Sequence, residues 1–343
     1  MTYKKPLVYY THKAPPEGSN LLRPFCEVIE NENYETPSKE DIILSAKNAY
    51  ALCCFVPDHI DEKIITSCSQ LRIIALFAKG YDNVDVAAAT REGIWVTNIP
   101  ESLTEPMADL TWALLLAVVR RLISADSFVR SGKFVGWSHP SPFLGSSVFG
   151  KTLGIIGMGE LGKAIACRAS GFNMQILYYQ RHRIDIDYER KLNLIYVPRD
   201  EIFIQSDFIC IATPLTNETF HQISTEELSL MKPLAYLINT ARGSEVDEEA
   251  VAKTLKEKRI AGYAADVFEM EDKQFLTRPS YVNQHLIDQP DCTVLTPHLG
   301  TAVMETRIEL AKMQAINVLQ VLKGEKPFGA VNDVPLKPAI ITG

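Results

Sequence analysis

Short runs of aliphatic residues recur along the chain, and polar or helical segments separate them. Continuous apolar runs are typical of parallel strands covered on both faces, and their alternation with helices indicates an α/β fold. In the first hundred residues the predicted strands are 6–10, 52–56, 73–77 and 95–97. Beyond residue 150 they are 153–156, 175–179, 208–212, 235–239, 262–265 and 293–295.

The longest helical pattern covers residues 103–132. Thr104 is a suitable N-cap, Pro106 lies in the first turn, and Gly132 follows the pattern as a stop. Because this helix is apolar on several sides, we expect it to be buried between domains or subunits. Shorter helices are predicted at 61–68 and 84–90, and a last one from near Thr301 to Gly324.

Length and composition fit a globular protein of two domains. The 343 residues are 46% hydrophobic and 22% charged, and a net charge of −7 argues against nucleic acid as the main partner. The first five residues lead directly into a strand, so no leader peptide is expected. The longest apolar stretch, 110–119, is too short to span a bilayer. We therefore expect a cytoplasmic protein.

A glycine-rich loop follows the predicted strand 153–156 and opens a helical pattern. The loop consists of Gly157, Met158, Gly159, Glu160, Leu161 and Gly162. In this context the glycines allow a tight turn, close approach of the backbone to a pyrophosphate, and close packing of helix on strand. The N–H groups at the helix start favour an anion. The loop therefore predicts a Rossmann dinucleotide-binding domain with a nicotinamide cofactor, and no metal is expected.

The order of the segments predicts one domain inserted in another. The Rossmann-like, doubly wound parallel sheet is expected in residues 107–302. Residues 1–106 and 303–343 are expected to form a second, flavodoxin-like α/β domain that holds the substrate. Ligands of such folds bind beyond the carboxyl ends of the strands, so the active site is expected in the cleft.

Three residues after the predicted strand 175–179 bear on the choice between NAD and NADP. NAD-binding domains usually place an acid here to hold the ribose hydroxyls, whereas this chain has Gln180, Arg181 and Arg183. No carboxylate would repel a 2′-phosphate, and two arginines can pair with one, so we expect NADP to be accepted. Alternatively, Gln180 hydrogen-bonds the ribose of NAD and both arginines are solvated.

Three polar residues in the second half of the chain each follow an apolar strand: Arg242, Glu271 and His298. Arginine can bind an oxyanion through two parallel hydrogen bonds. A histidine held by a carboxylate is a competent acid or base near neutral pH. Their common place at strand ends, downstream of the glycine loop, indicates a catalytic group.

The chain resembles the D-2-hydroxyacid dehydrogenases over nearly its whole length. The matching segments, in order, are 80–85, 157–162, 240–243, 266–271 and 296–300. The resemblance implies that Arg242 anchors the substrate, that Glu271 orients and tunes His298, and that Asp266 contacts the nicotinamide carboxamide. It also implies a homodimer. The further cofactor contacts expected are Gln180, Arg181, Thr213, Pro214, Thr240, Ala241, Arg242, His298 and Gly300.

Within this family the chain is similar to the phosphite (phosphonate) dehydrogenases in segments 78–83, 128–137, 262–272 and 296–307. Lys79 stands where the family usually has an uncharged residue, and a second cation suits a dianion better than a monocarboxylate. Arg307 can supply a third cation. The main hypothesis is therefore NAD(P)-dependent oxidation of phosphite to phosphate. Its substrate would be bound by Lys79, Gly80, Arg242 and His298, with His298 or Arg307 activating water.

Two alternatives stay open. The first is a 2-hydroxyacid dehydrogenase or glyoxylate/hydroxypyruvate reductase, in which His298 exchanges a proton with the substrate and Arg242 holds its carboxylate. The second is a dinucleotide-sensing protein of the corepressor type, which acts by binding a partner. The presence of Arg242, Glu271 and His298 together argues against this second alternative.

Overall fold

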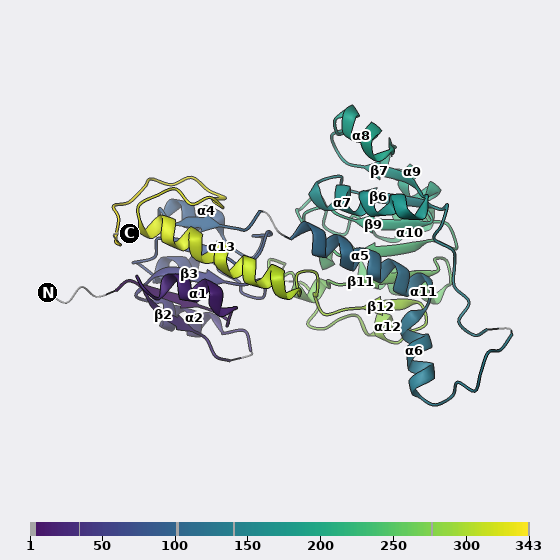
Figure 1. Ribbon diagram of the computed structural model, residues 1–343, viewed down its shortest axis with the longest axis horizontal. Coiled ribbons are helices and arrows are strands. Elements are labelled where there is room, and N and C mark those ends of the chain that lie inside the picture. The colour runs from purple at the N-terminus through teal and green to yellow at the C-terminus, as the bar shows by residue number, and fades with distance from the viewer. Residues whose placement is uncertain (1–4, 34, 101–102, 140, 276, 342–343) are drawn as a thin grey trace. The chain divides into compact units, whose positions relative to one another are not determined.

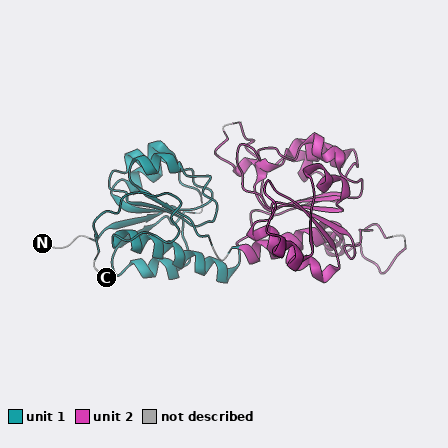
Figure 2. Cartoon of the chain, turned by 90° about the horizontal axis from the view of Figure 1, so that it is seen from above, with its two compact units in different colours: residues 1–103, 302–343 teal, residues 104–301 magenta. Residues whose placement is uncertain are grey.

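The computed structural model describes residues 5–33, 35–100, 103–139, 141–275 and 277–341. The first four residues, part of the segment that argues against a leader peptide, lie outside this range. The chain divides into two compact units, which are drawn in different colours in Figure 2. Unit 1 is residues 1–103 and 302–343, and unit 2 is residues 104–301. Each unit has its own parallel sheet, and the predicted α/β fold class is confirmed.

Unit 1 is built on a five-stranded parallel sheet with the order β2-β1-β3-β4-β5, which is the flavodoxin order. Its strands are β1 (Leu7–Tyr10), β2 (Glu27–Glu30), β3 (Ala49–Cys54), β4 (Ile73–Leu76) and β5 (Trp95–Thr97). The edge strand β2 escapes the sequence prediction because its side chains alternate between exposed and half-buried, which leaves no continuous apolar run.

Helices cover both faces of the unit 1 sheet (Figure 1). Helices α1 (Pro16–Leu22) and α13 (Met304–Leu322) share one apolar core with the sheet. The second core joins the other face to α2 (Lys39–Ala46), α3 (Glu62–Ser67) and α4 (Val86–Arg91). The C-terminal helix α13 is thus an integral part of the unit that begins the chain.

Unit 2 is built on a seven-stranded parallel sheet with the order β12-β11-β10-β9-β6-β7-β8. Read from β8, the first six strands follow the Rossmann order. The strands are β6 (Thr152–Ile156), β7 (Gln175–Tyr179), β8 (Leu194–Tyr196), β9 (Phe208–Ile211), β10 (Tyr236–Asn239), β11 (Gly262–Ala265) and β12 (Thr293–Leu295). The helices that accompany them are α7 (Glu160–Ala169), α8 (Ile186–Leu192), α9 (Arg199–Gln205), α10 (Thr225–Leu230), α11 (Glu248–Lys256) and α12 (Gln284–Ile287).

The prediction of a single helix over residues 103–132 is wrong. The structure has α5 (Thr104–Val119) and α6 (Leu122–Arg130), separated by Arg121 in the left-handed region at φ 52°. This backbone conformation interrupts the helical hydrogen bonds. Helix α5 packs into the core of unit 2, whereas α6 has no buried residue.

Candidate active site

The three candidate catalytic residues follow adjacent strands of unit 2. Arg242 comes after β10, Glu271 ends the short turn η3 (Glu269–Glu271) after β11, and His298 comes after β12. Because β10, β11 and β12 are neighbours in the sheet and run parallel, their carboxyl ends lie along one edge. The sheet topology therefore places all three segments at the same edge.

His298 and Glu271 form a direct pair. Nδ1 of His298 lies 2.6 Å from Oε2 of Glu271, and both side chains are about one quarter exposed. The other carboxylate oxygen, Oε1, accepts a hydrogen bond of 2.7 Å from the Phe268 N–H, which fixes the carboxylate. Within the described chain no residue engages Nε2 of His298. The pair therefore directs the Nδ1 proton to Glu271 and leaves Nε2 as the nitrogen that can exchange a proton with a substrate.

Asp266 holds the turn that carries His298. Its buried carboxylate accepts hydrogen bonds from the backbone N–H groups of Leu299 (2.7 Å) and Gly300 (2.8 Å) and from the Thr296 hydroxyl (2.6 Å). His298 itself has a φ of 55°, which costs free energy for a residue with a side chain. The dense bonding around Asp266 explains how this conformation persists. A contact of Asp266 with the nicotinamide would come in addition to this bracing.

The loop of Arg242 is braced from two sides. Buried Asn239 donates a 2.8 Å hydrogen bond to the Arg242 carbonyl and accepts one from the Ala241 N–H. Gly243 packs so closely on the next turn that a Cβ atom there would lie 1.9 Å from the carbonyl carbon of Phe268. Since Phe268 also binds Glu271, the turns that carry Arg242 and Glu271 are packed directly against each other.

The glycine loop fits a dinucleotide. Gly157 has a φ of 92°, and a Cβ atom on Gly162 would lie 2.2 Å from the Gly157 carbonyl, so neither position accepts a side chain. A Cβ atom on Gly159 would meet no atom within 4 Å, which leaves open space at the start of α7. Glu160 and Leu161 are the first residues of that helix. This space, beside free helical N–H groups, suits the pyrophosphate of NAD or NADP.

The three residues after β7 have different surroundings. Gln180 accepts a 3.0 Å hydrogen bond from the Met158 N–H and donates one to the His182 carbonyl, so it ties the glycine loop to β7. Arg183 makes two 2.7 Å bonds to the buried Glu189, which hold the pKa of this carboxyl at about 2. Arg181 is exposed and has no ion pair in the part of the chain that the structure describes. Of the two arginines, Arg181 is therefore the one left for a 2′-phosphate.

Three further predicted cofactor residues lie on the loops of the same sheet. Thr240 is buried and shares a hydrogen bond of 2.8 Å with Thr111 of α5. Thr213 and Pro214 follow β9, where Pro214 is exposed. The hydroxyl of Thr213 donates a short hydrogen bond to Oε2 of Glu245, which also accepts one of 2.6 Å from Gln222.

Glu245 was not among the predicted site residues, although it lies three positions after Arg242. Its side chain is fully buried, and Oε1 has no hydrogen-bond partner among the described residues. Burial raises the pKa of Glu245 to about 8, although the bonds from Thr213 and Gln222 lower it. Burial therefore favours the uncharged form of this carboxyl group. A signal in the sequence was a charged residue two positions after the motif 240–243, which follows an apolar strand.

This burial predicts a pH dependence of stability. The folded pKa of Glu245 is about 8 against an ordinary value of 4.5, so the stability it contributes is complete below pH 4.5 and is lost as the pH rises to 8. We expect Glu245→Gln, which cannot ionise, to reduce this decline in the free energy of unfolding by up to about 5 kcal/mol. Glu248, whose pKa burial raises to about 7, keeps part of the slope. Urea unfolding at several pH values measures this pH dependence of the free energy of unfolding.

The exposed Glu249 provides the matched control. Glu249→Gln should leave the pH slope of the wild-type protein unchanged. An equal slope in Glu245→Gln and in the wild type would contradict the assignment of a buried, neutral carboxyl group.

The other two predicted cations belong to unit 1. Lys79 is exposed and follows β4, with Gly80 next to it. Arg307 lies in the first turn of α13, where its guanidinium is 5.7 Å from the centre of the Phe77 ring and burial lowers its pKa. Neither cation has an acidic partner within 4 Å in the described ranges. Lys79 and Arg307 are therefore two basic side chains of unit 1 with no ion pair to a described carboxylate.

Known proteins resemble this chain over almost its full length. Residues 112–300 match the family described as D-isomer specific 2-hydroxyacid dehydrogenase, NAD binding domain. A glyoxylate reductase of Thermococcus gammatolerans is 44% identical over 97% of this chain and 98% of its own length. A glyoxylate reductase of Pyrococcus furiosus is also 44% identical, over 97% of each chain. The crystal structure of NADPH-dependent glyoxylate/hydroxypyruvate reductase from Sinorhizobium meliloti, in complex with NADP and malonate, is similar with a TM-score of 0.83 and 28% identity, covering 98% of this chain and 100% of that one.

Proposed function

Because this chain belongs to the D-isomer specific 2-hydroxyacid dehydrogenases, which are NAD(P)-dependent enzymes, we propose that it reduces glyoxylate or a similarly small 2-oxo acid such as hydroxypyruvate. The observation that carries the proposal is the His298–Glu271 pair at the sheet edge that also presents Arg242. The relatives named above are glyoxylate reductases, which supports this choice over phosphite oxidation. We assign dinucleotide binding to unit 2 and substrate-anion binding to Lys79 and Arg307 of unit 1.

The reaction converts a 2-oxo acid, NAD(P)H and a proton to the 2-hydroxy acid and NAD(P)⁺. The cofactor, when bound, supplies the hydride for the carbonyl carbon. Arg242 binds the substrate carboxylate through two parallel hydrogen bonds, which fixes the plane of the substrate. Protonated His298 donates from Nε2 to the carbonyl oxygen and releases its proton as that oxygen becomes a hydroxyl. Glu271 holds the opposite ring nitrogen and stabilises the imidazolium before transfer.

Phosphite oxidation remains a second candidate because Lys79 and Arg307 favour it. Two cations that have no acidic partner among the described residues suit a substrate with two negative charges better than a monocarboxylate. In this candidate Lys79, Gly80, Arg242 and His298 bind phosphite, and His298 or Arg307 activates the attacking water.

A pair of absorbance assays at 340 nm distinguishes the two candidates. One follows loss of NADH or NADPH with glyoxylate, hydroxypyruvate or pyruvate, and the other follows formation of NADH or NADPH from phosphite. We expect rapid loss with a 2-oxo acid and little formation from phosphite. Formation from phosphite, with no turnover of any 2-oxo acid, would reverse the order of the candidates.

For the cofactor, we propose that Arg181 binds the 2′-phosphate of NADP. We expect Arg181→Ala to raise the KM for NADPH by roughly 10- to 100-fold, because a charge-assisted hydrogen bond contributes about 1.5–3 kcal/mol. The KM for NADH should stay unchanged. Arg183→Ala is the control, because it breaks the pair with Glu189. It should lower the melting temperature without changing the ratio of the KM values for NADPH and NADH. Steady-state kinetics with both cofactors would contradict this role if Arg181→Ala left the ratio unchanged.

We also propose that the protein is a homodimer that uses α6 and the segment after it. Large apolar side chains are exposed here, including Val135 at 98% and Trp137 at 88%. Such a group of exposed apolar side chains indicates an interface. Light scattering should give the mass of two chains, and Val135→Asp with Trp137→Asp should shift it to one. Leu234→Asp, a charge on another exposed apolar residue of unit 2, should leave the mass unchanged. A wild-type mass of one chain would contradict the proposal.

A further inference from the structure

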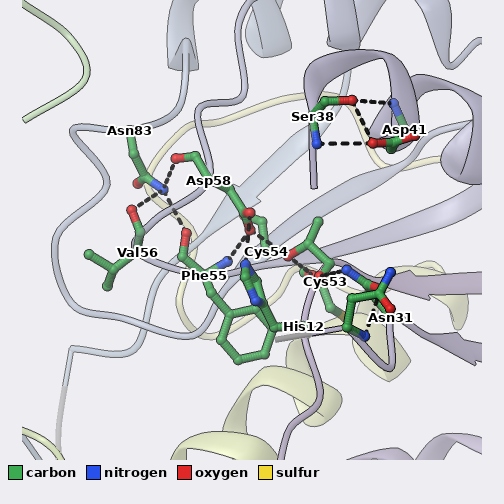
Figure 3. A network of polar contacts seen from close by, with 12 residues as sticks. His12, Asn31, Ser38, Asp41, Cys53, Cys54, Phe55, Val56, Asp58 and Asn83 are labelled. Carbon is green, nitrogen blue, oxygen red and sulfur yellow. Dashed lines mark hydrogen bonds and ion pairs between the residues drawn. The ribbon is translucent and has the colours of Figure 1, made fainter. Parts of the chain in front are cut away.

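A buried acid of unit 1 has no part in the proposed reaction. Asp58 is 1% exposed and lies in the loop after β3. Its Oδ2 accepts hydrogen bonds from the Thr11 hydroxyl and, at 2.7 Å, from the Phe55 N–H, and its Oδ1 lies 3.2 Å from Nε2 of His12 (Figure 3). A buried carboxylate is costly unless it is hydrogen-bonded, and these three partners satisfy it. Since Thr11 and His12 follow β1, Asp58 joins the carboxyl ends of β1 and β3.

Asn83 binds the same loop from the other side. Its Nδ2 donates hydrogen bonds of 2.9 Å to the carbonyls of both Phe55 and Asp58, as Figure 3 shows. The Asn83 carbonyl accepts a further 2.9 Å bond from the Ile60 N–H. Asn83 ends the segment 79–83, which begins with Lys79 after β4. The loop after β3 and the segment that presents Lys79 are therefore held together by hydrogen bonds from both the side chain and the backbone of Asn83.

A series of aromatic contacts connects Asp58 with Arg307, the second cation of unit 1. The ring of His12 lies 5.3 Å from that of Phe55 in an edge arrangement, and Phe55 stacks on Phe77 with 4.8 Å between centroids. The guanidinium of Arg307 lies over the other partner of this stack, Phe77. Offset and edge-to-face aromatic contacts have preferred geometries, so the position of each ring constrains the next. Asp58 thus constrains the surroundings of Lys79 through Asn83 and those of Arg307 through Phe55.

We propose that Asp58, with His12 and Asn83, is a positioning residue that fixes the edge of unit 1 on which Lys79 and Arg307 bind the substrate anion. This rests on the proposed function, which assigns substrate-anion binding to unit 1. Asp58 itself does not touch the substrate. It acts by holding the backbone of the loop after β3, and a displacement of about 1 Å in groups that bind a substrate is enough to cost about 100-fold in kcat/KM.

Steady-state kinetics of Asp58→Asn test this role. We expect the KM for glyoxylate to rise by roughly 10- to 100-fold, with kcat within about twofold and the KM for NADPH unchanged, since the glycine loop lies in unit 2. Asn83→Asp, which removes the amide donors, should raise the KM for glyoxylate in the same way. It replaces Asp58→Asn in the test if that variant folds poorly. Asp61→Asn is the matched control, because Asp61 also accepts a backbone N–H and pairs with a cation, Lys39. It should lower the melting temperature and leave the KM for glyoxylate unchanged.

Hydrogen–deuterium exchange of the free protein separates this proposal from the proposed function. In Asp58→Asn the peptides covering residues 53–60 and 77–85 should exchange faster than in the wild type, whether or not glyoxylate is the substrate. Unchanged exchange in both peptides would overturn the proposal even in an active enzyme. So would a lowered melting temperature with an unchanged KM for glyoxylate, because that is the behaviour of a residue that serves stability alone. A wild type inactive on every 2-oxo acid, with faster exchange in the variant, would overturn the proposed function and retain the role of Asp58 in holding the loop.

Discussion

His298→Ala is expected to lower kcat for glyoxylate reduction by roughly 10²- to 10⁴-fold, the contribution of a positioned general acid. The pair with Glu271 leaves Nε2 as the only ring nitrogen available to the substrate, so the variant loses the proton donor itself. The dissociation constant of NADPH, measured by fluorescence, should change little because the glycine loop is intact. Stopped-flow or steady-state absorbance at 340 nm measures kcat.

His221 offers a close control for this experiment. It is also a histidine of unit 2 in the left-handed region, at φ 48°, and its Nε2 lies 3.0 Å from a carboxylate oxygen of Glu269. His221→Ala removes an equivalent pair without a proposed role in the chemistry. We expect its kcat to stay within a few-fold of the wild type. Equal losses in both variants would show that pairing to a carboxylate, and not proton transfer, explains the effect.

Arg242→Leu is expected to lower kcat/KM for glyoxylate by roughly 30- to 5,000-fold, because loss of one partner of a charge pair typically costs about 2–5 kcal/mol. Arg242→Lys should recover only part of the loss, since a lysine keeps the charge but not the two parallel hydrogen bonds. Arg168→Lys is the control, as Arg168 pairs with Glu105 and Asp109 in unit 2 without a part in the proposed reaction. Full activity of Arg242→Leu on glyoxylate would exclude Arg242 as the carboxylate anchor.

The buried parts of the fold were predictable because their apolar runs are continuous. The strands β4, β6 and β10 are buried almost throughout, and each is visible as an aliphatic run. The break at Arg121 was not predictable, because the left-handed conformation of one arginine has no signature in a pattern that stays helical on both sides. The edge strand β2 was not predictable either, because its partial exposure to solvent leaves no continuous apolar run.

The candidate site was predictable as far as polar residues follow apolar strands. That rule selected Arg242, Glu271 and His298, whose segments the sheet places at one edge. The bracing of the His298 turn by Asp266 through backbone N–H groups depends on contacts that no spacing reveals. The pairing of one arginine with a buried carboxylate was equally hidden. Arg181 and Arg183 look equivalent in the sequence, and only the fold shows that buried Glu189 neutralises the second.

The stereochemistry of the product tests the central claim most directly. The protein is incubated with hydroxypyruvate and NADPH, and the glycerate formed is resolved by chiral chromatography. A D-isomer specific hydroxyacid dehydrogenase, with Arg242 holding the carboxylate and His298 protonating the carbonyl oxygen, is predicted to give D-glycerate alone. L-glycerate, a racemic product, or no glycerate from an enzyme that turns over phosphite would contradict the account.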